Sequence, residues 1–351
     1  MKLSQLIRSD REFREFLSVV REQAAKGDHL PIAVNGLNGG ARDIFLIESI
    51  RDVLKTSEKP ILILVPTESE REATASLLQS VGIDGISYKN RDLIFYNVKA
   101  SHDVDRERLS VLSAILNGQA KCVVSTPEAA LGYTMPKSVL EENSVAIKVG
   151  DDHSPASLCQ KLTNLGFMRV EIVDGKGQFA QRGDILDFWG GESENPIRME
   201  FFGDEIDRMT VFDPITQRTV EMIDDVSLLP AREVLITKES RAEILTTIEA
   251  LIDKQKDPTM RERLERERGV VLGGGSIDFR DRFLGLIYPE CENLFDYLGS
   301  SVIFVLGTNE CSESVTKHLT HLSANHPWQP IKKKQHPLER DSNLVHQLLD
   351  T

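Results

Sequence analysis

The chain has no excess of basic residues. Its 351 residues include 42 Lys and Arg against 55 Asp and Glu, which gives a formal net charge of −13 at pH 7. A module that grips nucleic acid needs a basic surface to neutralise phosphates. We therefore expect direct DNA binding to be weak or absent.

Long apolar runs, cysteines and metal-ligand patterns are also scarce. No run reaches the about 18 apolar residues of a membrane span, so we expect a cytoplasmic protein without one. The four cysteines form no CxxC pair, which favours buried, reduced thiols over disulfides. His318 and His321 have no Cys or acidic residue at ligand spacing, so we expect no metal site.

What the sequence does contain is a change of pattern along the chain. An opening helix is expected over residues 1–26. Apolar runs at 31–35, 61–65 and 122–125 then alternate with helical stretches, which predicts a mainly parallel sheet. From about 150 to 235, short β-branched and aromatic runs, including 169–173 and 197–202, are separated by turns and follow one helix at 154–165. These runs predict a mostly antiparallel module.

The last third turns helical again. A charged helix is expected over 240–268, a loop at the glycines 273–275, and a buried strand at 301–306 that extends the first sheet. The predicted fold class is α/β: a P-loop-like parallel-sheet domain interrupted by a small, mostly antiparallel β-rich (α+β) domain. The expected division is 1–148, then 149–235 as the inserted domain, 236–335 as the continuation of the first domain, and 336–351 as a linker.

Residues 36–43 have the layout of a phosphate-binding loop without its chemistry. A working P-loop reads GxxxxGK(S/T), in which the Lys reaches the phosphates and the hydroxyl holds magnesium. Here Gly36, Gly39 and Gly40 are followed by Ala41, Arg42 and Asp43, which replace the last Gly, the Lys and the hydroxyl residue. A carboxylate at that place opposes phosphate, so we expect no nucleotide cofactor. The alternative is an ordinary Gly-rich turn.

The run 197–202 gives the clearest indication of a surface. In a strand, alternate residues face opposite sides. Ile197, Met199 and Phe201 then form a core face, while the opposite face holds Arg198, Glu200 and Phe202. Arg and aromatic residues outside a core are the types that anchor protein–protein interfaces. The alternative is that Phe202 lies under a neighbouring loop.

The sequence Asp-Glu-Ile-Asp at 204–207 matches the helicase motif DExD, but its flanking residues differ from those of a Walker B motif. A catalytic Walker B carboxylate follows a buried parallel strand and needs an intact P-loop. Here Phe-Phe-Gly precedes the motif and Arg208 follows it, which predicts a hairpin turn. We expect no catalytic residue in this motif.

Three blocks carry a family resemblance: GFMRVEIVDGKGQFAQRGDILDFW, NPIRMEFFGDEIDRMTVFDPITQRT and SLLPARE. They resemble the bacterial transcription-repair-coupling factor (Mfd) family and, less closely, UvrB. The resemblance is specific over about 165–235 and collinear over 1–340. It implies an α/β domain interrupted by a small domain that binds UvrA, the ATPase of nucleotide excision repair. The broken P-loop also agrees with the coupling factors.

The resemblance implies three UvrA-contacting residues, Arg182, Arg198 and Phe202. It also implies that the long aromatic hairpin with which UvrB probes damaged DNA is missing, because residues 92–101 are short and poor in Tyr. Nothing resembles the RNA-polymerase-interacting domain or the ATP-dependent DNA translocase of the full-length family. The expectation is thus an N-terminal fragment, with those other domains as further partners.

Two hypotheses follow for the function. The first is a non-catalytic adaptor that recruits UvrA to stalled RNA polymerase in transcription-coupled DNA repair. The alternative is an ATP-dependent, helicase-like module acting on DNA through an unusual phosphate loop. Arg42 and Asp43 discriminate between them, because only the second hypothesis requires these residues to accept a nucleotide.

Overall fold

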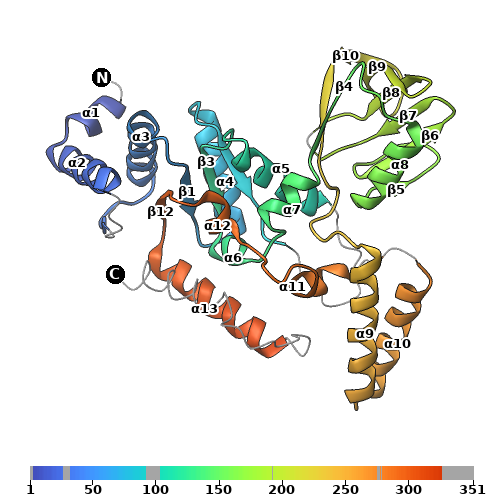
Figure 1. The fold of residues 1–351 in the computed structure, drawn as a ribbon. Helices are drawn as coiled ribbons and strands as arrows, with labels where there is room; N and C mark the ends of the chain where they lie inside the picture. Colours follow the sequence, from blue (N-terminus) through green and yellow to red (C-terminus); the bar gives the residue numbers. More distant parts are fainter. Residues whose placement is uncertain are drawn as a thin grey trace. The chain divides into compact units, whose positions relative to one another are not determined.

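The computed structural model describes residues 3–26, 32–91, 103–191, 193–274, 277 and 279–325 (Figure 1). The chain divides into two compact units, the first made of residues 1–90, 114–132 and 294–351, and the second of 91–113 and 133–293. The predicted fold class, a parallel-sheet domain with a mostly antiparallel β-rich part, is confirmed. The boundaries expected at 148, 235 and 335 stay a prediction.

Some expectations concern parts of the chain that are not described. Pro31, the segment 92–101, Gly275 and the linker 336–351 lie outside the described residues, and so do the side chains of His318 and His321. Among the helices that are described, none combines the length and the apolar character that crossing a membrane requires.

The first unit is built on a parallel sheet with the strand order β12-β1-β3-β2. Its strands are β1 (Ile61–Leu64), β2 (Gly85–Tyr88), β3 (Cys122–Ser125) and β12 (Val302–Val305). The central strands β1 and β3 are buried along their whole length, as expected for parallel strands covered on both faces. The predicted strand at 301–306 is confirmed, because β12 pairs with β1, although as an edge strand it is only half-buried.

Helices complete the first unit: α1 (Leu3–Ser9), α2 (Arg11–Lys26), α3 (Gly40–Thr56), α4 (Glu68–Ser80), α6 (Pro127–Leu131), α12 (Leu294–Leu298) and α13 (Thr308–Asn325). The apolar side chains of α3 and α4, such as Ile50 and Leu78, join those of β1 and β3 in one core. The predicted single opening helix is wrong. Asp10 interrupts it, and its carboxylate accepts a bond from the Phe13 N–H at 2.9 Å, which caps α2.

The expected strand at 31–35 is also wrong within the described residues. Residues 32–35 have no strand conformation, and Ile32 and Val34 are 37% and 43% exposed. A short apolar run does not by itself distinguish a strand from other conformations. The core side chains of α3 pack against β1 and β3 without help from this segment.

The second unit holds a six-stranded sheet with the order β10-β9-β8-β7-β6-β5. Its strands are β5 (Met168–Arg169), β6 (Gln178–Arg182), β7 (Ile185–Phe188), β8 (Ile197–Phe202), β9 (Glu205–Phe212) and β10 (Thr219–Ile223). Only β5 and β6 run parallel. The strand expected at 169–173 is limited to β5, because the chain bends at Glu171 and Ile172 before Val173 turns into the interior. A separate antiparallel pair joins β4 (Val145–Lys148) to β11 (Asp225–Leu228).

One face of the six-stranded sheet forms a core with the helix α8 (Pro155–Asn164). Phe179, Leu186, Met199 and Met209 come from four neighbouring strands and lie in this core beside Leu162. The predicted helix at 154–165 is therefore confirmed, with Ser154 as its N-cap. The opposite face of the sheet is partly buried as well, at Asp187 and Phe212.

The remaining helices of the second unit are α7 (Lys137–Glu142), α9 (Lys238–Lys254), α10 (Pro258–Leu272), the 3₁₀ turn η1 (Arg280–Phe283), α11 (Leu284–Ile287) and most of α5 (Asp103–Leu116). The single helix expected over 240–268 is wrong. Pro258 starts a new helix at its first position, and the Asp257 side chain caps it by accepting the N–H groups of Thr259 and Met260.

A buried charge cluster lies inside the second unit. Glu233 follows β11, is fully buried, and accepts hydrogen bonds from Arg91, Arg108 and Thr134. Burial opposes its charge, but the charges of Arg108 and Arg91 lower the pKa of Glu233 below its ordinary value. This carboxylate therefore ties the exit of the β-rich part to α5 and to the segment before α7.

Asp105 on α5 lies in the same cluster and behaves in the opposite way. Burial raises its pKa to about 7, and the charges of Asp281 and Glu233 add to the rise, against the effect of Arg91 and Arg108. The folded chain thus holds a proton on Asp105 that the unfolded chain releases near pH 4.

We predict that this difference makes the folded state less stable as the pH rises from about 4 to about 7, by up to about 1.4 kcal/mol per pH unit. Asp105→Asn mimics the neutral acid. The free energy of unfolding of the variant minus that of wild type should be larger at pH 7.5 than at pH 5, as measured by urea titrations. An effect of equal size at both pH values would contradict the assignment.

Candidate protein-binding face

Strand β8 carries the candidate site, and its pleat separates two sets of side chains. Ile197, Met199 and Phe201 are 3%, 1% and 7% exposed and belong to the core. Phe202, the last residue of the strand, is 82% exposed. The predicted strand register is confirmed, and the alternative that a loop covers Phe202 is wrong.

Two Gly-Asp turns bring Arg182 and Phe202 to the same end of the sheet. Arg182 ends β6 before the turn Gly183-Asp184, and Phe202 ends β8 before the turn Gly203-Asp204. Gly183 and Gly203 have φ values of 60° and 67°, which suit glycine at the first central position of a two-residue hairpin loop. Because β6 and β8 run in the same direction with β7 between them, both strand ends point the same way.

Arg198 lies on the outer face but is turned toward its own sheet. Its Nε and Nη2 donate to the two carboxylate oxygens of Asp187 at 2.7 and 2.9 Å. Its guanidinium carbon lies 4.4 Å from the centre of the Phe212 ring. The hydrogen bond to Asp187 raises the pKa of Arg198 above its ordinary value.

Arg182 shares this partner. Its Nη2 donates to Asp187 at 2.8 Å, while its side chain stays 48% exposed. One strand further, Arg208 and Glu200 form an ion pair of their own at 2.6 Å on the same face. The outer face therefore presents one aromatic ring beside a set of paired charges.

The residues of the degenerate P-loop lie before α3 and in its first turn. Gly36 to Gly39 lead into α3, which begins at Gly40. Asp43 lies in the first turn of α3, where an acidic side chain interacts favourably with the positive end of the helix dipole. This is the place that a bound phosphate takes in a working loop.

The residues of the DExD motif lie partly in a turn and partly in a strand. Asp204 lies in the hairpin turn, and β9 begins at Glu205. Ile206 is a fully buried core residue. The predicted hairpin position is confirmed, and no parallel strand precedes the motif in this described part of the chain.

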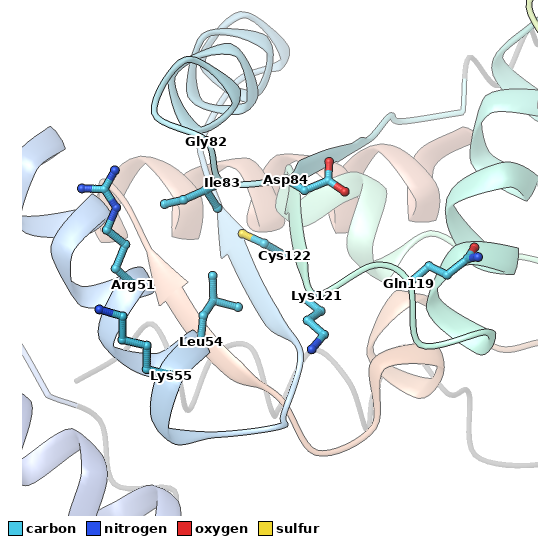
Figure 2. A pocket seen from close by; sticks show the side chains of 9 residues that line it. All are labelled: Arg51, Leu54, Lys55, Gly82, Ile83, Asp84, Gln119, Lys121 and Cys122. Atoms are coloured by element: carbon cyan, nitrogen blue, oxygen red, sulfur yellow. The ribbon is translucent and has the colours of Figure 1, made fainter.

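A cavity of about 420 Å³ in the first unit is lined by none of the residues 36–43 of the degenerate P-loop. Its lining residues come from α3 and from the segments at the amino ends of β2 and β3, as Figure 2 shows: Arg51, Leu54, Lys55, Gly82, Ile83, Asp84, Gln119, Lys121 and Cys122. Ligands of open α/β sheets bind at the carboxyl ends of the strands. The basic ends of Arg51, Lys55 and Lys121 are also spread apart rather than directed at one point (Figure 2).

Sequence reasoning missed Asp187 and Glu233, the two buried carboxylates that organise the arginines. Asp187 lies eleven positions before Arg198 in the chain but directly opposite it across β7 and β8. A charged residue inside the run ILDF, where a core residue is expected, was the only indication.

Comparison with known proteins finds a family match over this face. Residues 145–234 match the family model of the UvrB interaction domain. That segment is therefore similar to a UvrB interaction domain. It contains α8, the whole six-stranded sheet and all three residues of the candidate face.

The similarity to whole proteins extends further along the chain. The transcription-repair-coupling factor of Bacillus subtilis is 27% identical over 285 residues, which covers 77% of this chain and 24% of that protein. That of Myxococcus xanthus is 35% identical over 195 residues, covering 55% and 16%. The UvrABC system protein B of Fervidobacterium nodosum is 27% identical over 258 residues, covering 67% and 39%. The chain thus spans well under half the length of these relatives.

We predict that neighbouring phenylalanines on β8 behave oppositely on truncation. Phe201→Ala should lower the free energy of unfolding by about 3–5 kcal/mol, because it opens a cavity in the core. Phe202→Ala should change it by less than about 0.5 kcal/mol, because the ring is exposed. Thermal and urea unfolding of the two variants measure this difference. Early melting of Phe202→Ala alone would show that the register is wrong.

We also predict that the chain shows no saturable binding of ATP with magnesium at millimolar concentration. The carboxylate of Asp43 lies in the first turn of α3, where its charge opposes phosphate, and the Arg42 Nε lies 3.5 Å from it. Isothermal titration calorimetry checks this. A saturable one-to-one isotherm would contradict it and would favour the enzyme hypothesis.

Proposed function

We propose that the chain is an adaptor module that recruits UvrA to stalled RNA polymerase in transcription-coupled DNA repair. The family match and the names of the relatives support a role in repair. The observation that carries the proposal is Phe202, an aromatic ring 82% exposed at the end of an ordered strand inside the matched domain. Large exposed side chains of this kind are typical interface anchors.

In this proposal Arg182, Arg198 and Phe202 form the UvrA-binding face. The polymerase-binding and translocase parts implied by the family would be separate partners. Direct DNA binding would be weak, given the net charge of −13. The proposed role places the chain in the cytoplasm, where transcription and repair act on bacterial DNA.

The proposal favours an adaptor over an ATP-dependent enzyme. The position of Asp43 in the first turn of α3 speaks against phosphate binding there. The hairpin position of Asp204 likewise speaks against a Walker B role. No feature of the described residues gives specific support to the enzyme hypothesis.

We predict that Phe202→Ala weakens UvrA binding by about 2 kcal/mol or more, roughly thirtyfold in affinity, because it removes the central anchor. Ile172→Ala is the matched control. This side chain is 56% exposed in the same domain but lies in the bend that follows β5.

Titration of labelled chain with purified UvrA measures the effect. Ile172→Ala should bind like wild type. Equal affinity of wild type and Phe202→Ala would remove Phe202 from the interface. Absence of any wild-type binding would overturn the proposed function itself.

A further inference from the structure

A single buried carboxylate holds both arginines of the candidate face. Asp187 is 1% exposed and accepts three hydrogen bonds, two from Arg198 and one from Arg182. A buried carboxylate of this kind needs paired cations to offset the cost of its desolvation. Both arginines therefore stabilise the buried Asp187 within the chain itself, and their contributions differ.

Arg198 is committed to the sheet. Its Nε–H and one Nη2 N–H bind Asp187, and the other Nη2 N–H lies 3.2 Å from the Gln217 Oε1. Its plane covers the Phe212 ring, and the side chain is only 18% exposed. Of the guanidinium donors, only those on Nη1 remain for another molecule. Arg198 cannot offer the two-pronged edge with which arginine grips a partner carboxylate.

The turn that follows β9 helps to keep Arg198 in place. Gln217 has a φ of 60°, and it alone among the described non-glycine residues has a positive φ. Its N–H donates to the Asp213 carbonyl at 2.8 Å. A non-glycine residue in this conformation persists only where its surroundings over-determine it. Here the turn places the Gln217 amide oxygen against Arg198.

Arg182 is bound less extensively within the sheet than Arg198. It makes one bond to Asp187, through Nη2, and its side chain is 48% exposed. Its Nε–H and Nη1 donors are not used in that bond. The charge count also selects Arg182. Asp187 neutralises one of its two arginines, and Glu200 is paired with Arg208, so the cluster of Asp187, Arg182 and Arg198 keeps one positive charge.

We propose that Asp187 is a positioning residue for the face, that it holds Arg198 as a structural platform, and that Arg182 alone forms the ion pair with the partner. The inference rests on the proposed function and assigns a chemistry to the partner's subsite. That subsite is an apolar pocket for Phe202 with one carboxylate for Arg182. The two anchors start from Cα atoms about 12 Å apart, given two strand spacings across and two residues along the sheet.

A charge-restoring double variant tests this assignment. Arg198→Gln leaves Asp187 with one arginine, so the chain should unfold at lower urea and Asp187 should draw Arg182 away from the partner. Asp187→Asn added to Arg198→Gln brings the charge of the cluster at positions 182, 187 and 198 back to its wild-type value of one positive unit. The amide oxygen introduced at 187 can still accept a bond from Arg182.

The measurements are urea unfolding and titration with UvrA at low and high salt, at a temperature where every variant is folded. We expect Arg198→Gln to lose urea resistance and affinity, and the double variant to recover most of both. Arg182→Gln should keep its urea midpoint, lose about tenfold or more in affinity, and show a flatter salt dependence. Arg261→Gln on α10 is the matched control, since Arg261 is also half-exposed and paired with a carboxylate, and it should match wild type in every assay.

Failure of the double variant to recover affinity would overturn the inference, because Arg198 would then contact the partner directly. A flattened salt dependence in Arg198→Gln equal to that in Arg182→Gln would overturn it as well. Both results require that the wild-type chain binds UvrA. If it does not bind, the proposed function fails first, and this outcome is distinct from a wild-type chain that binds but whose double variant is not rescued.

Discussion

The pairing of Asp187 with Arg198 across β7 and β8 is the interaction on which the outer face depends. A carboxylate that is 1% exposed would be costly alone, and its two arginines make its burial tolerable. The same pairing lays Arg198 over Phe212 and leaves Arg182 at the rim. The pairing of charges within the sheet thus determines which side chains are available to a partner.

The pleat of β8 determines which of its side chains lie on the outer face. With one face of the strand committed to the core around Met199, every second side chain must point outward, and Phe202 is the last of them. The two-residue turns after Arg182 and Phe202 leave both side chains at the end of the sheet. A rigid strand end presents an aromatic anchor at a small cost in conformational entropy on binding.

Much of this was readable in the sequence, and the failures have physical causes. The period of two in 197–202 gave the register, because a slip by one residue would bury Arg198 and Glu200. The Asp187 partnership was not readable, since it depends on strand pairing between distant positions. The breaks at Asp10 and Pro258 carried local capping signals that the continuous charge pattern concealed. Strand β2 was missed because it has only four residues, and Gly85 and Ser87 interrupt its apolar pattern.

The most direct test is protection of the face itself. Glu205 lies opposite Phe202 across β8 and β9, and its side chain is exposed. In Glu205→Cys, the rate at which a maleimide modifies the new thiol should fall in proportion to the fraction of chain bound as UvrA is added. In Glu262→Cys, on the exposed side of α10, the rate should stay constant. An unchanged rate at position 205 under saturating UvrA would contradict the account, because the partner would then be bound elsewhere.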